Sequence, residues 1–239
     1  MRRSWFYSAM GAIVLFAVLV GFGRTYAVPM ARGTFEAPAV VHVHGAFAAA
    51  WILLFLTQPL LVRFRHVKLH RQIGRIGLPL AIGVAVTMIP AGFFQATREA
   101  AAGAGPTGIS SVLGVFTSGA LFVGLVIAGI VARKDREAHA RWLLLATLVV
   151  VWPAWIRWRH YFPSVPTPDF WFAIVLAYIW IPIAAIRDRY VRGSVHPVIA
   201  WGGLLVIVEQ GMEVVAFDSP PWRATAHVLY RWLEQSWFV

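Results

Sequence analysis

Residues 40–77 read VVHVHGAFAAAWILLFLTQPLLVRFRHVKLHRQIGRIG, an apolar run of membrane-spanning length that ends in a strongly basic turn. No charged residue occurs between Ala46 and Val62, and Gln58 is the only strongly polar side chain there. A run of this length and polarity predicts a helix that crosses the hydrocarbon core of a bilayer. Cationic and imidazole side chains crowd its end, namely Arg63, Arg65, His66, Lys68, His70, Arg71 and Arg75. The positive end predicts which side of the membrane is cytoplasmic.

The composition of the whole chain is that of an integral membrane protein. Of its 239 residues, 59% are hydrophobic and 13% are charged, and the mean hydropathy is +0.70, too apolar for a soluble globule of this size. The net charge of +11 comes from Lys and Arg clustered in short loops between apolar runs. We interpret this charge as a topology signal, with anionic membrane lipids and not nucleic acid as its partners. The lack of cysteine excludes disulfides and thiolate metal sites.

Apolar runs predict an all-α fold of seven transmembrane helices joined by short loops. The predicted spans are residues 5–23, 40–62, 76–96, 110–132, 142–158, 170–187 and 196–217. With the N-terminus inside, two thirds of the 21 Lys and Arg residues lie on the inner side, so we expect the N-terminus inside and the C-terminus outside. Residues 1–218 then form one transmembrane domain of the bacterial inner (plasma) membrane, with a core bundle at about 40–158.

Residues 219–239 carry too many charges to span a membrane. Their apolar side chains recur at helical spacing, with Trp222, Ala226 and Leu229 opposite Arg223 and His227. This pattern predicts an interfacial amphipathic helix on the outer leaflet.

Two histidines, His70 and His139, are predicted to lie at one depth near the inner surface. Each follows a basic turn at the end of a span that contains a related Gly-Ala pair. This pattern is typical of two repeated hairpins. Imidazole is a common axial ligand of low-spin haem iron, and the adjacent Arg71 and Arg141 suit haem propionates. The histidines therefore indicate a b-type haem site (haem b) between the second and fifth spans. The alternative interpretation is that both are solvated residues of the membrane surface.

The segment HGAFAAAWILLFLTQPLLVRFRHVKLHRQIG resembles the core of the transmembrane b-type (cytochrome b561-like) cytochromes, which pass electrons from ascorbate to ferric iron. The later HARWLLLATLVVVWPAWIRW is similar to a pattern of uncharacterised bacterial multi-helix membrane proteins. That cytochrome family uses four histidines on successive helices, and His44, His70 and His139 match the first, second and fourth. The third has no counterpart, so the resemblance implies an inner haem at most. It also implies an oxidoreductase that transfers electrons between a quinol or small-molecule reductant and an acceptor.

A second group of candidate residues is acidic. Glu209 and Glu213 lie four residues apart in the seventh span, hence on one helix face, and ionisable residues within a span usually serve a function. With His44 they would suit zinc or another divalent metal, as in a metal-dependent membrane hydrolase. A carboxylate and a histidine also relay protons, as quinone chemistry requires. A purely structural alternative is that they pair with Arg157 or Arg159.

A third function class is compatible with the same sequence. The chain then serves as a non-catalytic subunit or assembly factor of a larger membrane complex, or as a homo-oligomer, and binds no cofactor.

Overall fold

Seven helices long and apolar enough to cross a membrane occur within residues 5–237, the part of the chain that the computed structural model describes. Those residues contain no β-strand. The helical segments are α1 (Phe6–Phe22), η1 (Gly23–Ala27), α2 (Val28–Ala31), α3 (Ala39–Arg63), α4 (Val67–Gly74), α5 (Gly77–Glu99), η2 (Ala100–Ala104), α6 (Pro106–Val131), η3 (Ala132–Lys134), α7 (Arg136–Ile156), η4 (Arg157–His160), η5 (Asp169–Leu176), α8 (Trp180–Arg192), η6 (Val198–Gly202), α9 (Gly203–Ala216) and α10 (Pro220–Trp237). The number, length and apolar composition of these helices confirm the prediction of an all-helical, multi-pass membrane protein.

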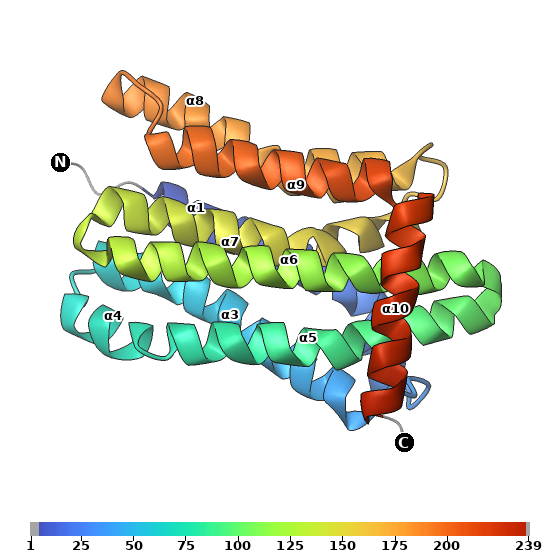
Figure 1. Cartoon of the computed structure of the whole chain (residues 1–239). Coiled ribbons are helices and arrows are strands. Elements are labelled where there is room, and N and C mark those ends of the chain that lie inside the picture. Colours follow the sequence, from blue (N-terminus) through green and yellow to red (C-terminus); the bar gives the residue numbers. More distant parts are fainter. Residues whose placement is uncertain (1–4, 238–239) are drawn as a thin grey trace.

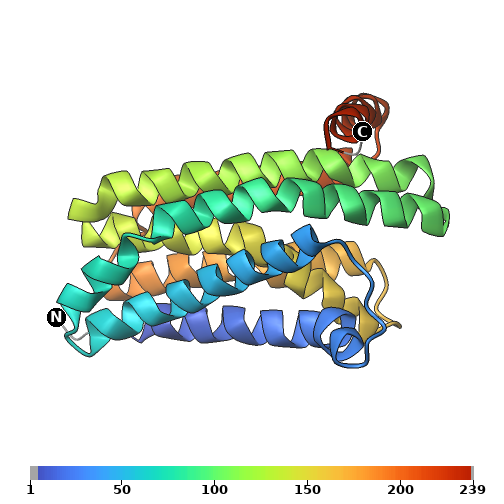
Figure 2. The same ribbon diagram turned by 90° about the horizontal axis from the view of Figure 1, so that it is seen from below.

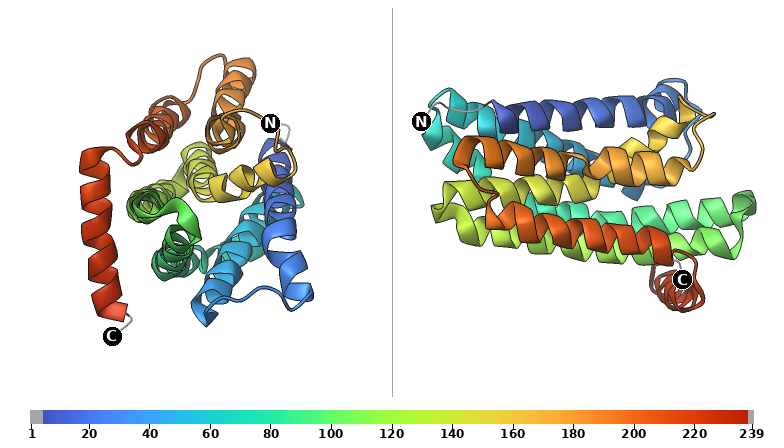
Figure 3. Two further views of the ribbon diagram at one scale, coloured as in Figure 1. Left: turned by 90° about the vertical axis from the view of Figure 1, so that its right-hand side faces the viewer. Right: turned by 90° about the horizontal axis from the view of Figure 1, so that it is seen from above.

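Helix α7 lies at the centre of the bundle. In the view along the bundle, the other spans surround it (Figure 3, left), and it packs against α1, α6, η5 and α9. The most apolar window of its span is 61% buried, whereas none of the other six exceeds 33%. Six consecutive residues, 144–149, are all buried, as expected for a helix that is apolar on every side. Since α1 packs on both α3 and α7, the core extends beyond residues 40–158 to the first span.

The outer surfaces of the spans are apolar. Tyr190, Val215 and Trp201 are 90%, 81% and 73% exposed, on the helices at the edge of the bundle. A soluble protein rarely exposes so many large apolar side chains. Lipid chains are the solvent that such a surface requires.

Among the boundaries that differ from the sequence prediction, three have a visible structural cause or content. The first span continues through η1 and α2 to Ala31, because Arg24 donates to the His160 carbonyl at 2.5 Å and lies over the Tyr161 ring. The predicted basic turn after the second span contains a two-turn helix, α4. The fifth span begins at Arg136 and not at residue 142, because the buried charge of Arg141 is paired.

Helix α10 lies crosswise to the spans. It passes over α6 and α5 (Figure 1) and is seen almost end-on in Figure 2, where the spans run lengthwise. Its Tyr230 ring stacks on Phe93 of α5 at a centroid distance of 4.6 Å, and its Ala226 and Leu233 are buried. The predicted C-terminal amphipathic segment is therefore a helix packed on the side of the bundle.

Candidate functional site

One end of the bundle gathers the basic turns and both predicted haem ligands. We call this the basic end; it comprises residues 63–75, 132–141 and 187–197, which lie at the side of Figure 1 where the N-terminus is marked. Asp135 begins α7 there, since its carboxylate accepts hydrogen bonds from the backbone N–H groups of Ala138 and Glu137 at 3.2 and 2.9 Å. These bonds cap the helix and lower the pKa of Asp135. The cap fixes the first turn of α7, which contains His139.

The ring of His139 has one nitrogen engaged and one without a hydrogen bond to any residue within 5–237. Its Nδ1 lies 2.7 Å from the backbone carbonyl oxygen of Gly129 in α6. A carbonyl oxygen only accepts, so Nδ1 carries the proton, and in the neutral tautomer Nε2 is then the nitrogen with the lone pair. Histidines that bind metals commonly show this arrangement, in which a backbone carbonyl orients the ring and raises the basicity of the other nitrogen.

His70 lies on α4 and faces the same region. The backbone carbonyl of Gln58 in α3 accepts a hydrogen bond from its ring, and the ring interacts electrostatically with that of His139. The Nδ1 atom of His70 is buried without a hydrogen-bond partner, and so is the Nε2 atom of Gln58. A buried polar atom without a partner costs about 1–3 kcal/mol. His70 and His139 therefore lie at the same end of the bundle, and the buried His70 Nδ1 and Gln58 Nε2 atoms are polar groups that a ligand would satisfy.

The two arginines expected to bind propionates differ in their surroundings. Arg71 is exposed on α4. Arg141 is only 1% exposed, and its Nε and Nη2 atoms donate to Asp188 of α8 at 2.8 and 2.5 Å. Its Nη1 donates to the Glu137 carboxylate at 2.6 Å. Arg141 thus clamps α7 to α8. Its donor groups bind the carboxylates of Asp188 and Glu137, whereas the sequence predicted a haem propionate as its partner.

Sequence reasoning missed Asp188, the partner of this clamp. The side chain is 2% exposed and also accepts a hydrogen bond from the backbone N–H of His196 at 3.3 Å. Burial first, and then the charge of Arg141, lower the pKa of the His196 imidazole. The sequence feature that could have identified Asp188 is that it is the sole acid in the basic segment RDRYVR, residues 187–192.

A second polar cluster lies between α6, α9 and the sixth span. We call it the carboxyl network; it consists of Thr117, Ser118, Tyr178, Glu209, Gln210 and Glu213. Thr117 and Ser118 donate to the Glu213 carboxyl group, Ser118 at 3.3 Å. Gln210 Nε2 donates to Ser118 Oγ at 3.0 Å and to Glu209 Oε2 at 2.6 Å, and the Tyr178 hydroxyl donates to Gln210 Oε1.

The two carboxyl groups of this network also interact with each other. Glu209 and Glu213 lie within electrostatic range of each other, and Glu209 Oε1 is buried without a hydrogen-bond partner among the described residues. Two neighbouring carboxyl groups of this kind suit the uptake and release of a proton within the membrane-spanning region.

The pairing of the glutamates with Arg157 or Arg159 that we considered from the sequence is not formed. Arg157 donates to the Pro153 carbonyl at 2.5 Å and lies over the Phe22 ring, and Arg159 is 3.8 Å from Asp169.

His44 is separate from the glutamates. Its Nδ1 is 3.1 Å from the Thr87 hydroxyl, which itself donates to the Gly83 carbonyl at 2.6 Å, so His44 joins α3 to α5. Within residues 5–237 no group of three or more His, Asp or Glu side chains could hold a metal ion. The structure thus does not assemble the zinc site expected from His44, Glu209 and Glu213.

No protein-family model, curated protein or solved structure matches this chain. A functional assignment therefore has to be argued from the two polar clusters and the fold that holds them.

Proposed function

We propose that this chain is a membrane electron-transfer protein that holds one b-type haem at the basic end, between His70 and His139. It is supported by the position of two histidines from separate hairpins at the basic end: His70 has a buried Nδ1 without a hydrogen-bond partner among the described residues, and His139 has its Nδ1 held by the Gly129 carbonyl. Two neutral imidazoles are axial ligands that suit haem iron in both oxidation states. The haem would supply a one-electron carrier.

The residues around the pair hold the rings in position. The Gly129 and Gln58 carbonyls keep the protons of the two rings away from the ligand position. The Arg141–Asp188 clamp fixes the first turns of α7, and with them His139, against α8. With Arg141 engaged in this way, Arg71 is the one of the two predicted arginines that remains available to a propionate.

An absorption spectrum of the purified protein tests the proposal. We expect a Soret band, or its appearance when haem is added to protein purified without it, with stoichiometric saturation. Absence of the band after addition of haem excludes the proposal.

A second function, proton transfer coupled to quinol oxidation, is favoured by the two neighbouring carboxyl groups of the carboxyl network, of which Glu209 keeps a buried oxygen without a partner among the described residues. Oxidation of a quinol releases protons together with electrons, and a carboxyl pair within the span is a suitable acceptor. Glu213→Gln should slow the reduction of the haem by a short-chain quinol and leave its reduction by dithionite unchanged. Glu234→Gln, on the exposed face of α10, is the matched control. Equal quinol rates in both variants would exclude this role.

The orientation and location of the fold complete the proposal. We place the basic end at the cytoplasmic face of a bacterial inner membrane, because positive loops favour that side. Helix α10 then lies in the plane of the outer interface, since it runs crosswise to the spans (Figure 1) and carries Arg223, His227 and Trp232. The same orientation leaves the exposed apolar faces of the spans to lipid, a partner subunit or a second copy.

A further inference from the structure

A stripe of hydroxyl side chains, interrupted by one glycine, follows one face of α6. We call it the α6 stripe; it consists of Thr107, Ser110, Gly114, Thr117 and Ser118. Steps of three or four residues lead from one turn to the next, and this spacing places residues on one helix face. The last two hydroxyls donate to the Glu213 carboxyl group, and the first two donate to the Asp218 carboxylate at 2.7 and 2.6 Å. The stripe therefore leads from the carboxyl network to the turn before α10.

Gly114 is the position of the stripe that has no side chain. A Cβ atom added there would lie 3.5 Å from Glu213 Oε2 and 4.0 Å from Cζ2 of Trp222. The Trp222 ring is held at this place because its Nε1 donates to the Ser110 carbonyl oxygen at 2.9 Å. A carboxyl oxygen and an indole ring thus bound a space beside Gly114. At these distances the space accepts one atom of the size of a methyl carbon or a water oxygen.

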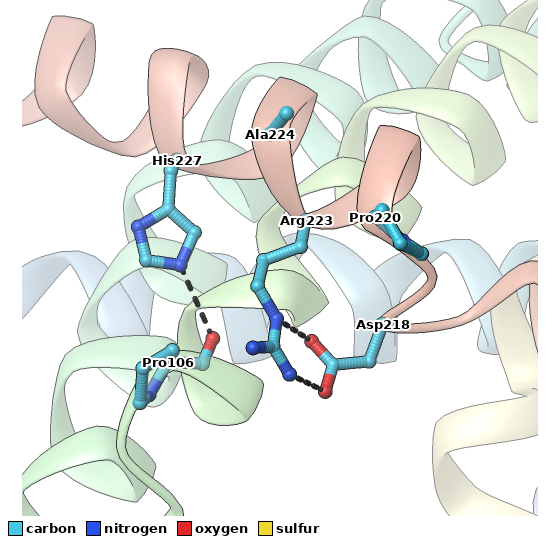
Figure 4. Close-up of a pocket in the computed structure, with 6 residues that line it drawn as sticks. All are labelled: Pro106, Asp218, Pro220, Arg223, Ala224 and His227. Atoms are coloured by element: carbon cyan, nitrogen blue, oxygen red, sulfur yellow. Dashed lines mark hydrogen bonds and ion pairs between the residues drawn. The ribbon is translucent and has the colours of Figure 1, made fainter.

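The start of the stripe reaches a surface pocket between α6 and α10. The pocket is lined by Pro106, Asp218, Pro220, Arg223, Ala224 and His227 (Figure 4). The Asp218 carboxylate also accepts from Arg223, with Nε at 2.8 Å, and its hydrogen bonds hold the pKa of Asp218 far below the ordinary value. Asp218 therefore stays ionised and fixes the Ser110 hydroxyl at the wall of the pocket.

From this arrangement we infer that a water molecule beside Gly114 links Glu213 to Ser110, and that the carboxyl network exchanges protons with the outer aqueous phase along the α6 stripe. Positions four residues apart on a helix are separated by about 5–6 Å, which one water bridges with two hydrogen bonds of about 2.8 Å. The inference rests on the proton-transfer role proposed above. It names the side of the membrane to which the protons go.

The relay moves one proton and returns each member to its starting form. The Glu213 carboxyl group gives its proton to the water, and the water passes a proton to the Ser110 hydroxyl oxygen. That hydroxyl releases its own proton to the Asp218 carboxylate. Because the pKa of Asp218 is so low, the carboxylate does not retain the proton and releases it to solvent in the pocket.

Infrared spectroscopy of the protein in liposomes tests this route. Transfer from light to heavy water shifts the C=O stretch of a protonated carboxyl group, and the Glu213 band is the one that Glu213→Gln removes in a pH series. Gly114→Ala should slow the exchange of this band at least ~10-fold, the effect of losing about one hydrogen bond on the path. Its methyl group fills the water position at ordinary contact distances, so the fold is kept. Gly124→Ala, in the same helix with no atom within 4 Å, is the matched control and should exchange at the wild-type rate.

Two further variants separate the relay from a change in packing. Gly114→Ser restores an oxygen beside Glu213 and should exchange nearly as fast as the wild type. Ser110→Ala removes the relay hydroxyl, keeps the carbonyl that holds Trp222, and should slow the exchange as Gly114→Ala does.

The outcomes distinguish the route from the function on which it rests. Exchange at the wild-type rate in Gly114→Ala or Ser110→Ala, or equal slowing in Gly114→Ser and Gly114→Ala, would overturn the route and leave the proton role of Glu213 intact. A pH series without any band that depends on Glu213 would overturn that role and the route with it. The haem spectrum depends on neither result.

Discussion

Removing the Asp188 carboxylate should cost more stability than any other single loss of an ion pair in this protein. Arg141 is 1% exposed and Asp188 is 2% exposed, and two nitrogens of the guanidinium bond the two carboxylate oxygens at 2.8 and 2.5 Å. In Asp188→Ala the cation stays buried, with only the half-exposed Glu137 beside it. Breaking a buried pair in this way costs about 3–5 kcal/mol.

The assay is unfolding by sodium dodecyl sulfate in mixed micelles, followed by far-ultraviolet circular dichroism. Arg192→Gln is the matched control, because Arg192 pairs with Glu137 at 3.1 Å but is 35% exposed, and loss of such a surface pair costs about 0–1 kcal/mol. The double variant Arg141→Met/Asp188→Leu should recover most of the stability, since an apolar pair leaves no buried charge. If Asp188→Ala costs no more than Arg192→Gln, the clamp does not anchor α7 and our account of His139 is wrong.

Three further predictions concern other parts of the fold. Gly21→Ala should lower the free energy of unfolding by about 1–3 kcal/mol, because the added Cβ would lie 2.2 Å from the Ala154 carbonyl oxygen. Gly124→Ala is the control: its added Cβ meets no atom within 4 Å, so it should stabilise its helix slightly. Coinciding melting curves of the two variants would contradict the packing of α1 against α7. Since the pKa of Asp218 is lowered chiefly by Arg223, the stabilising contribution of this pair is complete above the ordinary carboxyl pKa of ~4 and is lost as the pH falls below it. Wild-type protein should thus lose stability on acidification below that pH, and Asp218→Asn should lack this step in a pH series of thermal melts. Alkaline phosphatase fused after the last residue should be active and a fluorescent protein fused there should be dark, and the opposite pair of results would refute the proposed orientation.

The spans themselves were predictable because they depend on the composition of a single segment. The second span was expected at 40–62 and is Ala39–Arg63, since an apolar window of that length has few alternatives to a helix in lipid. The start of the fifth span was not predictable in the same way. Its first turns, 136–141, are charged, and only the packing of α8 shows that Asp188 neutralises Arg141.

The candidate sites show the same limit. The sequence correctly placed Glu209 and Glu213 on one helix face, but Glu213 accepts hydrogen bonds from hydroxyl groups of α6 and Glu209 from the Gln210 amide, instead of from Arg157 or Arg159. Which helix faces which is decided by packing across the whole bundle, and no local pattern encodes it. The convergence of His70 and His139 stays a prediction from their matching depth, whereas the hydrogen bond of His139 to the Gly129 carbonyl of α6 could be read only from the structure.

The most direct test of the central claim is a comparison of three histidine variants by absorption and electron paramagnetic resonance spectroscopy after addition of haem. His70→Ala and His139→Ala should each abolish the low-spin signal of a haem with two axial imidazoles. His66→Ala, an exposed histidine of the same basic end, should keep it. A low-spin signal that survives the loss of His70 or His139, or wild-type protein that takes up no haem, would contradict the account.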